Sequence, residues 1–158
     1  MRKLFVVVVG LALLGGFAVA KAGGELELRV QLLDTFEIAL GDSDGTGGAF
    51  YVKGNICEEL APLGPCTPIG SFHCWGWLFD STDVASSAVV SQEWNLDGRG
   101  KIQVLGVEDG GPRAIVGGTG DFKNARGEAT GFDFSVLMAA GDEFTGTFKL
   151  IGAKRKKH

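Results

Sequence analysis

The chain has 158 residues with a formal net charge of −4, and 45% of its residues are hydrophobic. This length supports a single domain with one core. The acidic balance argues against nucleic acid as a partner, because a phosphate backbone is bound by clustered Lys and Arg. The sequence also has 26 glycines. Since no long stretch after the N-terminus has a helical period, an all-β fold is favoured.

The N-terminus has the pattern of a secretory signal peptide. Arg2 and Lys3 precede an apolar run over residues 4–19, and small residues follow it. We therefore predict a cleaved segment over residues 1–22 and a secreted protein, periplasmic if the source is a bacterium. Cleavage would leave twelve basic and nineteen acidic residues, a net charge of −7. The run is short for a full span, so no stable membrane segment is expected, and an uncleaved anchor is the alternative.

Short alternating or apolar runs, separated by glycine-rich turns, predict eight strands. They cover residues 25–40, 50–56, 71–79, 89–96, 101–107, 113–116, 128–136 and 144–151. Eight antiparallel strands at regular spacing predict a single closed up-and-down β-barrel over residues 23–152, followed by a basic tail at 153–158. A β-sandwich is the alternative.

The predicted strand at residues 71–79 is apolar on both faces. Its alternate residues are Phe72, Cys74 and Leu78 on one face and Trp75, Trp77 and Phe79 on the other. In a barrel only one of these faces lines the interior. We therefore expect the other face to be covered by a loop, a helix or another subunit.

Three cysteines, Cys57, Cys66 and Cys74, lie close together in the sequence. An exported protein meets an oxidising compartment, so one disulfide is expected. We predict Cys57–Cys66, which would close an irregular, proline-containing loop and stabilise the fold by about 2–3 kcal/mol. Cys74 is then a buried free thiol. The other two pairings stay open.

Asp34 has the same parity as the apolar residues of the first predicted strand. A carboxylate on the apolar side is costly unless it is paired or protonated, so Asp34 is a candidate general acid. A β-bulge at residues 33–34 would instead rotate the side chain outwards. The pattern favours neither alternative.

The remaining motifs indicate neither a metal nor a cofactor. His73 has no accompanying nucleophile motif, and we expect it to be a hydrogen-bonded residue on an aromatic face. The glycine cluster at residues 117–120 lacks the Gly-Lys-Ser/Thr ending of a phosphate loop. No Cys/His pattern has zinc spacing.

The segment GGTGDFKNARGEA, residues 117–129, follows a short apolar run. It resembles the late-strand motif of plant dirigent proteins and, more distantly, that of allene oxide cyclases. Both families build a small antiparallel β-barrel with an apolar pocket, and the resemblance extends weakly over residues 49–151. It also implies a homo-oligomer, a trimer.

The resemblance suggests three catalytic residues. Dirigent proteins line their pocket with acidic residues and an arginine. Asp121 stands where the glycine-rich motif of the family has its acidic residue, and Asp34 lies roughly where an early strand has another. Arg126 matches the arginine of the family's Ala-Arg-Gly triplet. The histidine–aspartate pair that dirigent proteins carry on the first strand is missing here.

Three functions follow from these observations. We predict a secreted barrel that binds or steers a small hydrophobic molecule, phenolic or lipid-like. The first alternative is a cofactor-free isomerase or cyclase that uses Asp34 or Asp121 as a general acid. The second is a structural or interaction barrel whose interior is filled by aromatic side chains.

Overall fold

The structure is a computed structural model, which describes residues 24–38, 48–58, 60, 64–79, 88–132 and 140–152, with residues 35–38 described by their backbone alone. The predicted signal peptide (1–22) and basic tail (153–158) lie outside the described residues. Within these residues, no helix has the length and apolarity needed to cross a membrane.

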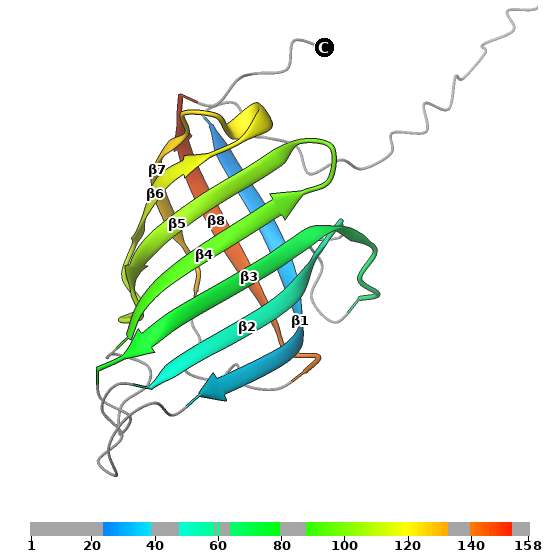
Figure 1. The fold of residues 1–158 in the computed structure, drawn as a ribbon. Helices are drawn as coiled ribbons and strands as arrows, with labels where there is room; N and C mark the ends of the chain where they lie inside the picture. Colours follow the sequence, from blue (N-terminus) through cyan, green and yellow to red (C-terminus); the bar gives the residue numbers. More distant parts are fainter. Residues whose placement is uncertain are drawn as a thin grey trace, which may run out of the picture.

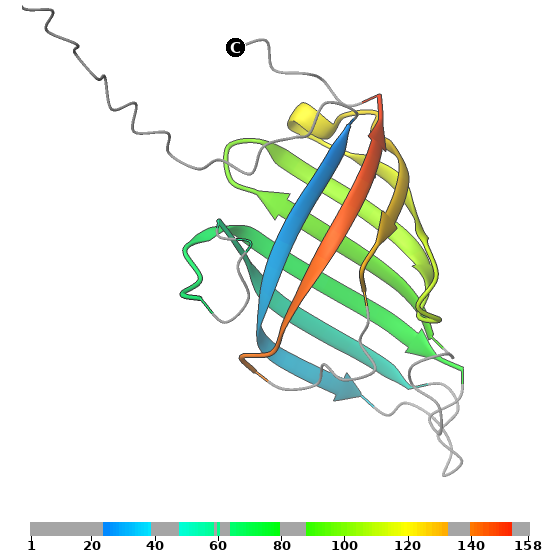
Figure 2. The ribbon, with the colours of Figure 1, turned by 180° about the vertical axis from the view of Figure 1, so that it is seen from behind.

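The described chain forms a closed barrel of eight antiparallel strands (Figure 1). Strands and one short 3-10 helix follow in the order β1 (Glu25–Ile38), β2 (Ala49–Cys57), β3 (Pro68–Leu78), β4 (Ala88–Leu96), β5 (Gly100–Val107), β6 (Arg113–Gly118), η1 (Gly120–Phe122), β7 (Arg126–Thr130) and β8 (Glu143–Ile151). Each strand pairs with the next one in the sequence, and β8 returns to pair with β1 (Figure 2). The predicted barrel is thus confirmed, and the sandwich alternative is wrong.

Strand boundaries differ from the prediction mainly in the second half of the barrel. The strand predicted over residues 128–136 begins at Arg126 and ends at Thr130, and residues 133–136 of that prediction lie outside the described residues. Gly131 follows with a φ of +89°, which ends the extended conformation. The prediction also missed η1, which comes directly after β6.

Aromatic side chains fill the middle of the barrel. The ring centroids of Trp94 lie 4.7 Å from Phe72 and 4.9 Å from Phe148, both in edge-to-face geometry. Inward-facing Gly146 makes room for them, because a Cβ there would lie 2.9 Å from both Trp94 and Phe132. Each buried ring stabilises the fold by about 2–3 kcal/mol. The pairing of small and large residues thus packs the centre of a narrow barrel.

The short helix η1 lies over one end of the barrel, at the top of Figure 1. Phe122 of η1 is buried in the core. The guanidinium of Arg99 lies 5.1 Å above its ring and 3.6 Å from the carboxylate of Asp121. Phe122 therefore packs against the core from this end.

Cys57 and Cys66 form the predicted disulfide, and Cys74 is a buried free thiol. The loop that the disulfide closes packs over Arg29, whose neighbours Leu28 and Val30 belong to the core. Arg29 donates hydrogen bonds to the carbonyl oxygens of Gly64 and Pro65 and is 1% exposed. An outward-facing arginine of β1 is thus buried by this loop.

Candidate functional site

Four polar or titratable side chains lie on the inner face of the barrel, which is otherwise apolar. We call Cys74, Gln92, Glu108 and Arg113 the inner polar cluster. Cys74 on β3 pairs in register with Gln92 on β4. Glu108 and Arg113 flank the turn that joins β5 to β6. All four are buried. Glu108 and Arg113 lie at the end of the barrel opposite η1, and Cys74 and Gln92 lie near the middle of their strands.

The turn between β5 and β6 explains why two charged residues face inwards together. Asp109 Oδ1 accepts a hydrogen bond from the backbone N–H of Gly111 at 2.8 Å, and Gly110 has a φ of +75°. The N–H of Glu108 donates to the carbonyl of Ala88 at 2.8 Å, which holds Glu108 against the start of β4. A tight turn of this kind returns the chain within five residues.

Glu108 and Arg113 form a buried ion pair. The distance from Arg113 Nη2 to Glu108 Oε1 is 3.7 Å, and their side chains are 1% and 7% exposed for Arg113 and Glu108 respectively. The guanidinium of Arg113 also lies 4.7 Å from the ring centroid of Phe132, a cation–π contact. The pair therefore lies at the edge of the aromatic cluster.

Gly106 provides the space for the Arg113 side chain. A Cβ built on Gly106 would lie 2.7 Å from Arg113 Cγ and 3.0 Å from its Cβ. Cβ is fixed by the backbone, and Cγ can move only by a change of the χ1 rotamer. A larger residue on β5 would therefore displace Arg113.

Burial changes the protonation of the pair. It raises the pKa of the Glu108 carboxyl to about 7, while Arg113 opposes the shift. Burial also lowers the pKa of Arg113, and Glu108 opposes that change. A carboxyl group with a pKa near 7 both gives and takes a proton at neutral pH, as a general acid or base must. The neighbouring guanidinium is suited to binding an anionic oxygen.

Cys74 and Gln92 form hydrogen bonds that lead to Trp94 of the aromatic cluster. Gln92 Nε2 donates to Cys74 Sγ at 3.8 Å, and Trp94 Nε1 donates to Gln92 Oε1 at 3.4 Å. Burial, and secondly Glu108, raise the pKa of the Cys74 thiol to about 12. Cys74 is therefore a protonated thiol at neutral pH and a poor nucleophile.

The structure places Asp34 on the outside of the barrel. The pairing of β1 with β2 shifts between Leu32 and Asp34, so the bulge alternative is correct. The extra residue turns Asp34 outwards, where its side chain is 56% exposed and lies 3.3 Å from Lys53 Nζ. Asp34 therefore has no contact with the inner polar cluster.

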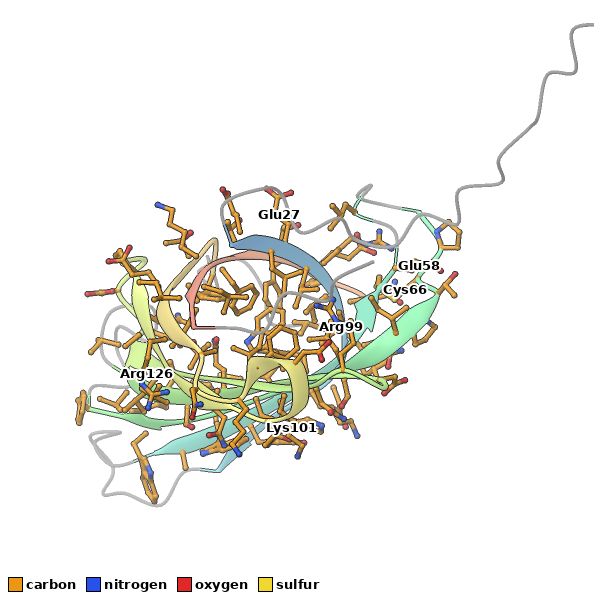
Figure 3. The ribbon with its side chains drawn as sticks, turned by 90° about the horizontal axis from the view of Figure 1, so that it is seen from above. Glu27, Glu58, Cys66, Arg99, Lys101 and Arg126 are labelled. Carbon is orange, nitrogen blue, oxygen red and sulfur yellow. A yellow bond between two sulfur atoms is a disulfide. The ribbon has the colours of Figure 1, made fainter. Side chains whose placement is uncertain are left out.

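Asp121 and Arg126 lie at the other end of the barrel, near η1. Asp121 pairs with Arg99, and Arg126 donates from Nη1 to the carbonyl of Ala125 at 2.7 Å. Arg126 is exposed and lies on the outer side of the barrel in Figure 3. The three residues suggested by the resemblance are thus not brought together, and their catalytic role stays a prediction.

Sequence reasoning missed Gln92, Glu108 and Arg113. The alternation of residues in β4 and β6 could have placed two of them on the inner face. Gln92 lies on the same strand face as Trp94, and Arg113 lies on the same strand face as Ile115. Glu108 had no such signal, since it lies beyond the end of β5. In the part of the chain that the structure describes, no group of three or more His, Cys, Asp or Glu could hold a metal ion.

Comparison with known proteins supports the fold. No family model matches the chain, and no curated protein matches it. A solved structure described as a pyocyanin demethylase is similar, with a TM-score of 0.60 and 19% sequence identity. The match covers 80% of this chain and 99% of that chain. At this identity the likeness shows a shared barrel fold.

Proposed function

We propose that this chain is a secreted, dirigent-like barrel that binds or steers a small hydrophobic molecule, phenolic or lipid-like. The ligand would lie at the end of the barrel that holds Glu108 and Arg113, with Arg113 contacting its polar group. Homo-oligomerisation, as a trimer, is part of the proposal. The signal-like N-terminus and the Cys57–Cys66 disulfide support secretion.

The observation that carries the proposal is the buried Glu108–Arg113 pair. Replacing a buried ion pair with apolar residues of similar size is often neutral or stabilising, so stability alone gives little reason to keep one. A pocket for a small molecule, in contrast, has mostly apolar walls and a few convergent polar groups. The similar solved structure is named as an enzyme that acts on a small molecule, pyocyanin.

A cofactor-free isomerase or cyclase is the second candidate. The pKa of Glu108, about 7, favours it, because proton transfer is most efficient when the acid titrates near the working pH. Glu108 would then be the general acid in place of Asp34. The tight aromatic packing around Trp94 favours the third candidate, a filled barrel.

Trp94 offers a direct test. The chain has three tryptophans, and Trp75 and Trp77 are exposed. The double variant Trp75→Phe/Trp77→Phe leaves Trp94 as the only tryptophan, buried in the barrel. We would titrate this variant with coniferyl alcohol and with an unsaturated fatty acid. Saturable quenching of Trp94 fluorescence is expected, and no change with either probe would favour the filled barrel.

Two arginine variants then locate the site in the same background. Arg113→Met should weaken binding by at least about tenfold, the equivalent of one lost charge-assisted hydrogen bond. Arg126→Met tests the resemblance instead, and exposed Lys149→Met is the matched control. If probe binding is lost in Arg126→Met and not in Arg113→Met, the assignment of the binding site to Arg113 is wrong. Loss of substrate conversion in Glu108→Gln, with binding retained, would favour the isomerase.

A further inference from the structure

The outer surface of β3, β4 and β5 carries a continuous apolar patch. We call Trp75, Trp77, Val89, Leu105 and Val107 the outer apolar face. The exposed fractions of its large side chains are 44% for Trp75, 56% for Trp77, 46% for Leu105 and 41% for Val107. Exposed tryptophan is uncommon on a protein surface that contacts only water.

Strand register makes these residues neighbours. Trp77 pairs with Val89, and Val89 pairs with Val107. One row along, Trp75 and Leu105 lie on either side of Ser91. The three strands run side by side across the front of the barrel in Figure 1. The side chains therefore form two adjacent rows on one wall.

We infer that the outer apolar face is where a second copy of this chain binds. The charge distribution favours a second copy. Each chain has a net charge of −4, so two copies repel one another in general. The outer apolar face has no charged residue. On the same wall, Lys101 and Glu93 neutralise each other at 2.7 Å. The outer apolar face therefore adds no charge repulsion of its own when two acidic chains approach.

The size of the patch agrees with a stable interface. The half-exposed rings of Trp75 and Trp77 offer roughly 100 Å² each. With Val89, Leu105 and Val107 the apolar total is on the order of 400 Å². A standard interface buries about 800 Å² on each partner, and a little over half of this area is apolar. Aromatic side chains are also the residues most enriched in interface cores.

This inference rests on the oligomerisation proposed above and is independent of the small-molecule ligand. Sedimentation velocity of the purified chain, over a range of micromolar concentrations, should give a mass that is a multiple of 16.6 kDa for the uncleaved chain. The double variant Trp75→Ser/Trp77→Ser should sediment as a single chain. Leu105→Lys, on a different strand, should do the same. Leu33→Ser is the matched control, because Leu33 is 47% exposed outside the face, and it should keep the wild-type mass.

The fold of the serine variant is checked by the fluorescence of Trp94, which is then its only tryptophan and should stay buried. A single-chain mass for the wild type would overturn the inference, including the case in which the face binds another partner. A wild-type mass in both face variants would overturn it as well. Ligand binding and self-association are tested separately by titrating the single-chain variants with the phenolic and fatty-acid probes. The inner site does not depend on the outer apolar face, so these variants should still bind the probes if the proposed function is correct.

Discussion

The barrel contains two buried arginines, Arg29 and Arg113, and each pairs with a glutamate. Both side chains are 1% exposed. Arg29 lies on the outer side of β1 and donates to two loop carbonyls as well as to Glu143 at 3.2 Å. Arg113 lies inside the barrel, 3.7 Å from Glu108 and above the ring of Phe132.

The difference lies in what surrounds the two charges. Arg29 binds the backbone of the disulfide loop to β1 and β8, so removing it would take away the hydrogen bonds that it donates to the carbonyls of Gly64 and Pro65. Arg113 contacts side chains of the barrel interior, the carboxylate of Glu108 and the ring of Phe132. The same residue type thus acts as a structural clamp on one side of the wall and as a candidate binding group on the other.

The largest expected effect is the loss of the structural clamp. Arg29→Met removes the guanidinium from the carboxylate of Glu143, which is 13% exposed, and from two loop carbonyls, and we expect the free energy of unfolding to fall by about 3–5 kcal/mol. Urea denaturation measures it, with the exposed Arg126→Met as the control. The double variant Arg113→Met/Glu108→Leu should be close to neutral, because both charges are removed together. A large loss of stability in this double variant would show that Arg113 is a second structural clamp.

The next prediction concerns the pH dependence of stability that the Glu108–Arg113 pair causes. The folded protein holds a proton on Glu108 up to a pKa of about 7, above the value of 4.5 for an ordinary glutamate carboxyl. Its stabilising contribution is therefore complete below pH 4.5 and is lost as the pH rises through 7. The difference amounts to about 3 kcal/mol at most. Stability curves of wild type and Glu108→Gln, compared by urea denaturation, should diverge across this interval, and parallel curves would contradict the shift.

The barrel itself could be predicted from the sequence. Alternation in β1 and β4, with the Asp97–Gly98 turn before β5, is local information, and Gly98 indeed has a φ of +67°. The Cys57–Cys66 pair was equally accessible, because it closes a short loop. Local patterns were sufficient wherever the structure repeats with the period of a strand.

The site could not be predicted in the same way. One extra residue between Leu32 and Asp34 reverses which side chains face inwards, and nothing in the sequence distinguishes a bulge from a regular strand there. The contact between Glu108 and Arg113 depends on how a turn returns the chain, and the burial of both depends on strands far away in the sequence. These are properties of tertiary structure.

Removing the disulfide tests whether Arg29 stabilises the fold through the loop that it binds. Cys57→Ser/Cys66→Ser should lower the free energy of unfolding by about 2–3 kcal/mol through the freed loop. Because Arg29 binds carbonyls of this loop, its substitution should cost less in the disulfide-free background than in the wild type. Arg113→Met should cost the same in both backgrounds. If the cost of substituting Arg29 is the same with and without the disulfide, the loop keeps its place without the disulfide.

A smaller effect is expected at Gly106, which makes room for Arg113. Gly106→Ala should destabilise the fold by about 1–3 kcal/mol through overpacking and should weaken binding of the phenolic probe by displacing the guanidinium. Gly117→Ala is the matched control, because a Cβ there meets nothing closer than 3.7 Å. Unchanged probe binding in Gly106→Ala would show that Arg113 does not contact the ligand.

The smallest effect is expected at a third ion pair, Asp34–Lys53. Its charged atoms are 3.3 Å apart, closer than those of Glu108 and Arg113, but the side chains are 56% and 44% exposed. Water screens such a pair, so Lys53→Ala should cost only about 0.2–1 kcal/mol, and added salt should reduce this further. Burial, more than distance, then decides what an ion pair does in this barrel. Asp34→Asn should leave probe binding unchanged, and a loss of binding would instead support the catalytic role that the resemblance suggests.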